Sequence, residues 1–292
     1  KNIEHLLQNA SFEFLNFDIN QPIDLSAYRE LEQFQLNVHG IQEIYHLACP
    51  ISKRQFEQFR VATLLTNSLG VKSVLDLALQ SKAKILYASS SVLYGPRRSE
   101  TPYLPETAES RIDHLTSHGA YDEGKRFSEA MMYTYADVYG LNVKISRMFR
   151  TYGPRIKIND GNMLPDMINQ ALDGEEILLH TNEHARMSLC YVSDIVDGLI
   201  KHMNASMDIR LMNLGSDQEY PLAEIADKII RLTGSSSRVR FEPTHGPSVE
   251  AGLPDLSQAK HALRWVPLVR LEDGLYKMIE YARSTRQLLT AF

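Results

Sequence analysis

Hydrophobic and polar positions along the chain follow two different periods, and together they predict strands connected by helices. Short apolar runs at 44–49, 84–88 and 143–149 are typical of buried strands. Apolar residues at helical spacing over 55–79 and 121–139 predict two long helices. Strands that alternate with helices in this way predict an α/β fold built on a doubly wound parallel sheet.

The pattern changes after residue 152. An aromatic-rich, alternating stretch at 12–18 predicts one more strand in the first part. Beyond residue 152, short helices alternate with short strands; the helices are expected near 161–173, 193–203, 221–233 and 271–288, and the strands near 177–180, 209–214 and 238–242. We therefore predict a sheet domain over 1–152. Residues 153–292 are predicted to form mainly a smaller α+β cap that binds the substrate, with some elements that can cross back to the main sheet.

The composition argues against several classes of partner. The 292 residues carry a formal net charge of −5 and are 43% hydrophobic, which is ordinary for a globular protein. We expect no nucleic-acid partner, because such a partner needs a basic face, and no membrane, because no run of about 18 apolar residues is present. Cys49 and Cys190 lie in apolar stretches, so we expect buried free thiols and a cytoplasmic location. No group of residues has metal-ligand spacing, so no metal is expected.

The segment Tyr121-Asp-Glu-Gly-Lys125 carries the most specific chemistry. Four residues apart on a helix, the tyrosine and the lysine lie on one face, one turn apart. An ammonium beside a phenol can lower the pKa of the phenol from about 10 toward neutrality, which makes Tyr121 a candidate general base. Ser90, at the end of the strand near 84–88, can hold the alcohol that loses the proton. Removing a hydride from that alcohol then requires a nicotinamide acceptor. The alternative is an exposed helical pair without function.

Seven stretches, in order along nearly the whole chain, carry a resemblance to a known family. They are Asn2-Ile-Glu-His-Leu6, Ile44-Tyr-His-Leu-Ala-Cys-Pro50, Tyr121-Asp-Glu-Gly-Lys-Arg126, Thr151-Tyr-Gly-Pro-Arg155, Asn159-Asp-Gly161, Tyr191-Val-Ser-Asp194 and Pro254-Asp255. The sequence resembles the extended short-chain dehydrogenases that modify nucleotide sugars, the NAD-dependent epimerase/dehydratase family. Within that family it is most similar to the UDP-glucuronate decarboxylases, also called UDP-xylose synthases.

The resemblance implies a Rossmann-like NAD-binding domain over 1–152 and a set of site residues. The implied catalytic residues are Tyr121, Lys125 and Ser90. The implied NAD-binding residues are Asp18, Ile19, Leu47, Ala48, Cys49, Asn67, Ser89, Tyr121 and Lys125. The implied substrate-binding residues are Ser91, Val92, Arg150, Thr151, Arg155 and Arg186. The chemistry that it implies is oxidation of a nucleotide sugar, with a UDP-sugar favoured, to a transient 4-keto form and its return by the same bound NAD. The family also implies a homodimer, formed by the long helices near 55–79 and 121–139.

The sequence departs from the family pattern at its start. The family begins with a strand, a Gly-x-x-Gly-x-x-Gly turn and a helix that holds the cofactor pyrophosphate. This chain starts just downstream of that unit, so the expected first β-α-β unit is absent. We expect an incomplete representation of a longer chain; the alternative is a protein that binds NAD poorly, as a catalytically silent homologue that binds a nucleotide sugar or a partner.

Further departures affect the substrate site. Val92 stands where the decarboxylases carry a glutamate, which weakens the decarboxylase hypothesis and favours a nucleotide-sugar 4-epimerase as the alternative. Arg150 replaces a family asparagine, and its alternative role is a surface ion pair. Arg186 lies one residue before the position of a family arginine, which is Met187 here, and a shift by one residue on a strand turns the side chain to the other face.

Overall fold

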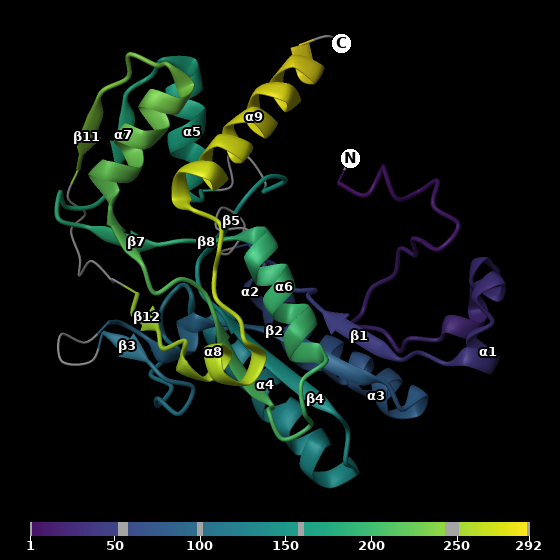
Figure 1. The fold of residues 1–292 in the computed structure, drawn as a ribbon. Helices are drawn as coiled ribbons and strands as arrows, with labels where there is room; N and C mark the ends of the chain where they lie inside the picture. The colour runs from purple at the N-terminus through teal and green to yellow at the C-terminus, as the bar shows by residue number, and fades with distance from the viewer. Residues whose placement is uncertain (1, 52–57, 98–101, 157–160, 243–250, 291–292) are drawn as a thin grey trace.

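The computed structural model describes residues 2–51, 58–97, 102–156, 161–242 and 251–290. Its centre is a four-stranded sheet in the order β1-β2-β4-β9, and every neighbouring pair in it is parallel (Figure 1). The strands are β1 (Glu43–His46), β2 (Lys84–Ser90), β4 (Val143–Met148) and β9 (Leu211–Leu214). The structure therefore has the predicted α/β architecture, and β9 comes from the second half of the chain.

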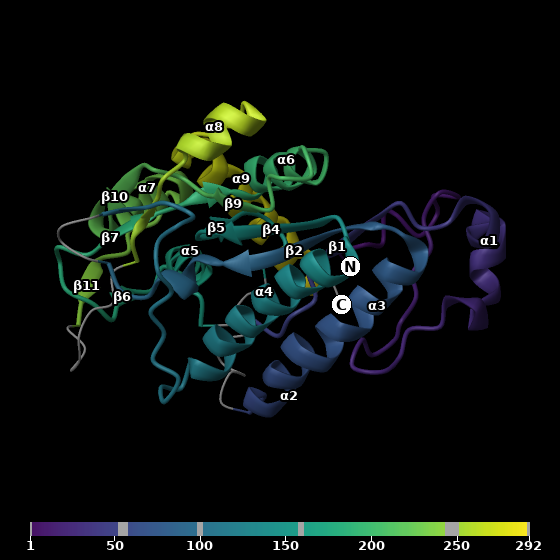
Figure 2. The same ribbon diagram turned by 90° about the horizontal axis from the view of Figure 1, so that it is seen from below.

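Helices cover both faces of this sheet (Figure 2). One face carries α2 (Arg60–Leu65), α3 (Val71–Ser81) and α4 (Gly119–Tyr139), and the other carries α6 (Val192–Met203) and α8 (Ser257–Leu263). The period of two along β2 explains this layering. Ile85 and Tyr87 belong to the cluster that contains α3 and α4, whereas Leu86 between them belongs to the cluster that contains α6 and Trp265.

The long helix predicted over 55–79 is interrupted. Residues 52–57 lie outside the described part of the chain, and a π-helical turn, η3 (Thr66–Gly70), separates α2 from α3. Short π-helical insertions of this kind are frequent at functional sites.

The strand predicted at 12–18 is wrong, because these residues form no ladder with any described strand. The first part of the chain, with the short helices η1 (Leu25–Ala27), η2 (Arg29–Phe34) and α1 (Leu36–His39), lies beside the β1 end of the sheet (Figures 1 and 2). A strand needs a hydrogen-bonded neighbour, and an alternating sequence alone does not supply one.

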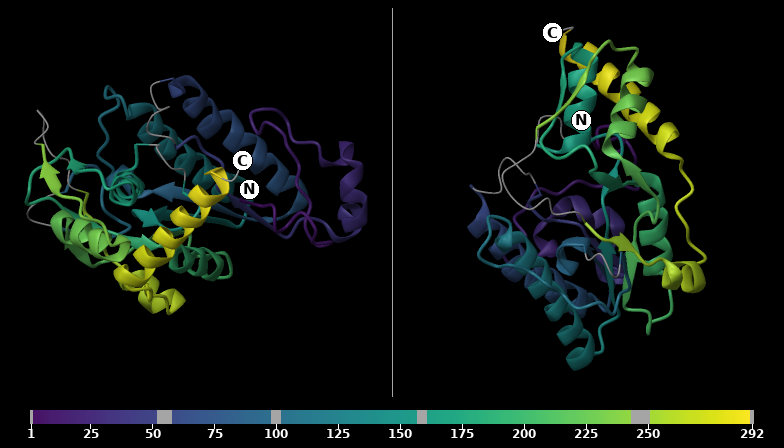
Figure 3. Two further views of the ribbon diagram at one scale, coloured as in Figure 1. Left: turned by 90° about the horizontal axis from the view of Figure 1, so that it is seen from above. Right: turned by 90° about the vertical axis from the view of Figure 1, so that its left-hand side faces the viewer.

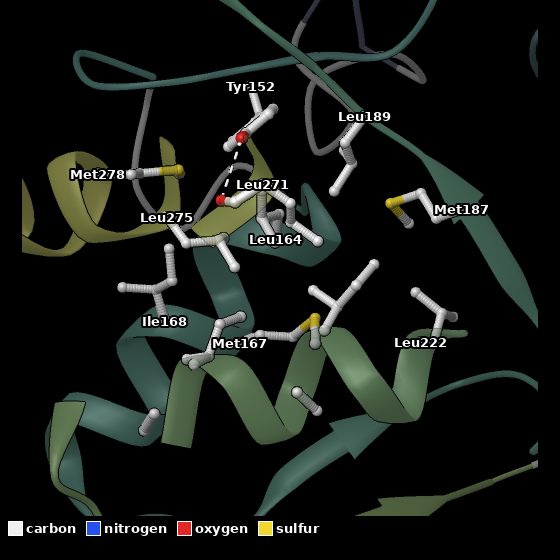
Figure 4. Packing of buried hydrophobic residues seen from close by; sticks show 14 of the residues in the cluster. Tyr152, Leu164, Met167, Ile168, Met187, Leu189, Leu222, Leu271, Leu275 and Met278 are labelled. Atoms are coloured by element: carbon white, nitrogen blue, oxygen red, sulfur yellow. Dashed lines mark hydrogen bonds between the residues drawn. The ribbon is translucent and has the colours of Figure 1, made fainter. Parts of the chain in front are cut away.

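A second lobe stands against the end of the sheet (Figure 3). It comprises α5 (Met163–Asp173), β6 (Ile177–Leu179), β7 (Arg186–Ser188), β10 (Glu219–Pro221), α7 (Leu222–Thr233), β11 (Val239–Phe241) and α9 (Leu271–Thr290). Its helices enclose an apolar core that includes Met167, Ile168 and Leu275 (Figure 4). In that core the Tyr152 hydroxyl donates to the Leu271 carbonyl over 3.3 Å.

Short elements connect the sheet to the second lobe. They are η4 (Ser91–Tyr94), β3 (Tyr103–Leu104), β5 (Thr151–Tyr152), β8 (Cys190–Tyr191) and β12 (Leu253–Pro254). Strand β3 pairs with β12, and β5 pairs with β8. Segments that are distant in sequence therefore meet where β2 and β4 end.

Both cysteines are free, Cys190 buried and Cys49 half-buried. Among the helices of the described ranges, we find none with the length and apolar character that a membrane span requires. The described side chains also contain no cluster of three or more histidine, cysteine or acidic residues suited to a metal ion.

Candidate active site

One face of the helix α4 packs against the end of β2. Tyr121 and Lys125 lie one turn apart on this face, as the sequence spacing predicted. Lys125 is buried, and its ammonium donates to the Ala88 carbonyl over 2.7 Å. The Ser90 hydroxyl lies close enough to the Tyr121 phenol to lower its pKa. The structure thus brings together Ser90, Tyr121 and Lys125, the proposed catalytic residues.

The electrostatics of this trio differ from the expectation. Burial raises the pKa of the Tyr121 phenol well above its usual value, although the Ser90 hydroxyl acts in the opposite direction. Burial also lowers the pKa of Lys125. The Lys125 ammonium lies 5.7 Å from the centroid of the Tyr121 ring and 4.6 Å from that of Tyr87. Desolvation therefore outweighs the ammonium, and the phenol is protonated at neutral pH.

Asn67 lies in the π-helical turn behind the trio. Its side-chain amide donates to the Thr63 carbonyl over 2.8 Å and to the Cys49 sulfur over 3.3 Å, and its Oδ1 accepts from the Tyr87 hydroxyl over 3.0 Å. The Ser128 hydroxyl, from α4, donates to the Asn67 backbone carbonyl over 2.8 Å. These contacts occupy the side chain of Asn67, so its part at the site is to hold β1, β2 and α4 together.

Gly124 makes this close approach possible. A Cβ at residue 124 would lie 3.0 Å from the Cβ of Asn67 and 3.1 Å from its amide nitrogen. Any larger residue in the motif Tyr121-Asp-Glu-Gly-Lys125 would push α4 away from the π-helical turn.

The loop after β1 is the open part of the site. Leu47 and Ala48 are exposed, and Cys49 is half-buried against Asn67. His46 is buried, and the described residues offer its Nε2 no hydrogen-bond partner. Burial lowers the pKa of His46 to about 4, so the ring is neutral at neutral pH.

The other two proposed cofactor contacts lie on the N-terminal segment. Asp18 is exposed, and its carboxylate accepts the Asn20 backbone N–H over 2.9 Å. Ile19 packs beside Gly70, at the end of the π-helical turn. The contact of Asp18 with the cofactor adenine stays a prediction.

Ser89 contacts Glu129 of α4, two turns along the helix from Tyr121. Its hydroxyl is buried and donates to Glu129 Oε1 over 2.5 Å, and Glu129 also pairs with Arg147. The sequence reasoning did not identify Glu129 or Arg147. Glu129 does follow Lys125 by four residues, so the helical period placed it on the same face of α4, but its partners depend on the register of β2 and β4.

Two proposed substrate residues follow Ser90 directly. Ser91 and Val92 begin the short helix η4, whose first turn is capped by the Ser90 hydroxyl accepting the Val92 N–H over 3.4 Å. Val92 is exposed, and it brings no titratable group to this edge of the sheet.

The proposed arginines do not converge on one point in this structure. The Arg150 side chain is exposed, and Arg155 donates to the Asn2 carbonyl over 3.0 Å. The Thr151 hydroxyl donates to the Phe149 carbonyl over 3.0 Å. Residues 159 and 160 of the family-like stretch Asn159-Asp-Gly161 lie outside the described residues.

Arg186 forms an ion pair that the sequence did not indicate. Its guanidinium lies 3.1 Å from the Glu219 carboxylate, and Arg97 reaches the same carboxylate over 2.6 Å. Met187 is buried, so the alternation expected of this strand holds. Only the antiparallel pairing of β7 with β10 brings Glu219 to Arg186, and sequence periodicity contains no information on that pairing.

The chain is similar to known proteins in sequence and in fold. Residues 4–221 match the model of the NAD dependent epimerase/dehydratase family. UDP-glucuronic acid decarboxylase 1 of Xenopus tropicalis is 34% identical over 286 residues, which cover 97% of this chain and 63% of that protein. UDP-glucuronic acid decarboxylase 3 of Arabidopsis thaliana is 33% identical over 280 residues, which cover 96% of this chain and 77% of that protein.

A solved structure shows the same fold. UDP-glucuronic acid 4-epimerase from Bacillus cereus, in complex with UDP-glucuronic acid and NAD, superposes with a TM-score of 0.81 at 22% identity, covering 97% of this chain and 85% of that one. The family model matches most of the chain. The chain therefore belongs to the NAD dependent epimerase/dehydratase family.

Proposed function

We propose that this chain modifies a nucleotide sugar of the UDP-glucuronate type by decarboxylation, through a transient 4-keto sugar and with NAD as a bound cofactor. The observation that carries the proposal is the meeting of Ser90, Tyr121 and Lys125 at the end of β2. The curated relatives are UDP-glucuronic acid decarboxylases, which supports the choice of substrate. The chain spans about 63% of the length of the Xenopus relative, so the activity of that relative is only a proposal for this chain.

The residues present fit one half of the cofactor. Tyr121 and Lys125 supply a phenol and an ammonium at the carboxyl ends of parallel strands, where open α/β sheets bind their ligands. The exposed Leu47 and Ala48 leave backbone groups accessible on the neighbouring loop. The sequence given holds no glycine-rich turn for the pyrophosphate.

The proposed mechanism uses the trio as a proton relay. When bound, NAD supplies the hydride acceptor that no side chain offers, together with the positive charge of its oxidised ring. Ser90 donates or accepts a hydrogen bond at the sugar 4-oxygen and holds it beside the phenol. Once ionised, a state that the positive charges of Lys125 and of the oxidised ring would favour, Tyr121 takes the proton of the 4-hydroxyl as general base and returns it at the end of the cycle. Lys125 stabilises the phenolate by its charge.

Val92 favours an epimerase as the second candidate. A ketone next to the carboxyl-bearing carbon makes carbon dioxide a good leaving group. The decarboxylases carry a carboxylate for this step at the position of Val92. Val92 is exposed at the end of β2 and can neither donate nor accept a proton. Inversion at carbon 4 needs only removal of a hydride and its return to the other face of the sugar.

One experiment separates the candidates. The purified protein is incubated with NAD and UDP-glucuronic acid, and the products are analysed by mass spectrometry and by NMR. Loss of carbon dioxide supports decarboxylation; an unchanged mass with an inverted 4-hydroxyl supports epimerisation. No turnover, together with no binding of NAD in calorimetric titration, would contradict the proposal and support a silent homologue.

We further propose a homodimer in a reducing compartment such as the cytoplasm. The exposed apolar side chains of α2 and of the adjacent face of α4 support a second copy as the partner; they are Val61, Leu64, Leu65, Phe127 and Val138. Free Cys49 and Cys190 support the compartment. Light scattering on the wild type and on Phe127→Asp tests the dimer, and an unchanged mass between the two would contradict it.

A further inference from the structure

A row of buried polar side chains crosses the sheet one residue before its catalytic edge. Ser89 of β2, Arg147 of β4 and Asn213 of β9 are direct neighbours in the parallel register. All three are buried, with exposed fractions of 1%, 8% and 0%. Polar side chains at such positions need partners from outside the sheet, because burying them without hydrogen bonds is unfavourable.

Glu129 of α4 is the partner of the first two. Its Oε1 accepts the Ser89 hydroxyl over 2.5 Å and the Arg147 Nε over 2.9 Å, and its Oε2 accepts the Arg147 Nη2 over 2.7 Å. The pair is thus bidentate and buried, a geometry that fixes orientation as well as distance.

Arg147 is held from its other side by groups that do not belong to α4. Its Nη1 donates to the Glu106 carbonyl over 3.2 Å, and its guanidinium lies 4.8 Å from the centroid of the Tyr94 ring. The Tyr94 hydroxyl donates to the Asn213 Oδ1 over 2.7 Å. The guanidinium therefore belongs to the sheet, and Glu129 is the group by which α4 attaches to it.

Three side chains on one face of α4 contact β2. Tyr121, Lys125 and Glu129 lie on successive turns of the helix, and they contact Ser90, Ala88 and Ser89. The first two contacts belong to the proposed catalytic relay. The third lies two turns away from Tyr121 and contacts no reacting group.

We propose that Glu129 and Arg147 are positioning residues, whose buried pair fixes the place of α4 along β2 and thereby the distance between the Tyr121 phenol and Ser90. This inference rests on the proposed function. A buried ion pair adds little to stability, since apolar residues of similar size often replace one without loss. Misplacement of a catalytic group by about 1 Å, in contrast, can reduce the rate about 100-fold. Glu129 also raises the pKa of Lys125, against the effect of burial.

The test compares variants that remove the pair in different ways. Glu129→Gln alone leaves the Arg147 charge buried without its counterion and is expected to lower the thermal midpoint. The double variant Glu129→Leu with Arg147→Met removes both charges. Ser89→Ala removes only the link to β2. Asp137→Asn is the matched control, because Asp137 also lies on α4 and pairs with Arg210 over 2.6 Å, far from Tyr121.

The double variant gives the decisive result. We expect a thermal midpoint close to that of the wild type, a kcat about 10- to 100-fold lower and an unchanged KM, since no sugar contact is altered. Ser89→Ala should lose less of kcat, and Asp137→Asn none. A merely structural role predicts instead that kcat recovers together with the thermal midpoint, and wild-type kcat in the double variant overturns the inference.

A second measurement does not depend on turnover. In crystals of the unliganded double variant, we expect the Tyr121 phenol to have moved away from the Ser90 hydroxyl; an unmoved phenol overturns the inference. If the wild type turns over no nucleotide sugar, the proposed function fails, whereas this displacement still decides whether the pair positions α4.

Discussion

Two regions of the molecule hold their elements together by opposite means. One is the contact between α4 and β2, and the other is the core of the second lobe. Between α4 and β2, buried Lys125, Glu129 and Ser89 form directional contacts at 2.7 Å or less. In the second lobe, α5, α7 and α9 pack through apolar side chains such as Met167 and Leu275 (Figure 4). Apolar burial is non-directional and supplies most of the stability, whereas the hydrogen bonds of a buried ion pair are directional and the pair adds little stability. Changes in the two regions should therefore separate activity from stability.

The largest effect is expected at Tyr121, the proposed general base. Tyr121→Phe removes the proposed base and should lower kcat by about 1000-fold, within the range of general base catalysis, with little change in the thermal midpoint. Steady-state kinetics with UDP-glucuronic acid measure this. Tyr139→Phe, an exposed tyrosine of the same helix, is the control and should keep wild-type kcat. Full activity of Tyr121→Phe would refute the assignment of the base.

The converse effect is expected in the second lobe. Leu275 is fully buried among apolar neighbours, so Leu275→Ala should lower the free energy of unfolding by about 2–5 kcal/mol. The kcat of the folded fraction should not change, because Leu275 belongs to the apolar core of the second lobe. Urea unfolding followed by circular dichroism measures the first quantity. Leu268→Ala, at a residue that is 78% exposed, should change it by less than about 0.5 kcal/mol.

Low pH should destabilise the central sheet more than the second lobe. Burial lowers the pKa of His202 to about 4 and that of His46 to about 4, whereas His180 and His184 of the second lobe are exposed. A neutral buried histidine stabilises the fold above its unfolded pKa of about 6.5, and this stability is lost as the pH falls toward 4.

For His202 the loss should be about 2–3 kcal/mol between pH 6.5 and pH 4. Hydrogen exchange at pH 4.5 should show the sheet opening before the second lobe. In His202→Asn, the dependence of unfolding free energy on pH should be shallower than in the wild type. An identical slope in both proteins would contradict the role given to His202.

The smallest effect is expected at Asp122. Burial, and secondarily the charge of Glu123, raise the pKa of Asp122 to about 6, so its carboxylate is unfavourable in the folded state at neutral pH. Asp122→Asn should therefore raise the free energy of unfolding by about 1 kcal/mol at pH 7, after allowance for partial exposure. The gain should vanish below pH 4, where the aspartate is protonated in both states. Chemical unfolding at pH 7 and pH 3.5 measures both values.

The sequence predicted those features that depend on short-range periodicity. The sheet, the helix that carries Tyr121 and Lys125, and the outward turn of Arg186 relative to Met187 all follow from the periods of 3.6 and 2. The prediction of a strand at 12–18 was wrong because a strand also needs a hydrogen-bonded neighbouring strand.

Features that depend on tertiary contacts were not predictable. The π-helical turn at Asn67 forms where Ser128 and Gly124 of α4 meet it. The partners of Glu129 are set by the register of β2 and β4, which no local pattern encodes. The raised pKa of Tyr121 reflects the depth at which the phenol is buried, and spacing along a helix does not report depth.

The missing side chain at residue 124 limits how this protein can be engineered. Replacing a helical glycine by alanine is a common route to greater thermal resistance, because it restricts the unfolded chain. At Gly124 the added methyl would meet the Asn67 Cβ at 3.0 Å, on the less flexible part of that side chain. A thermostabilisation campaign should therefore leave this glycine untouched and seek its gains in the second lobe.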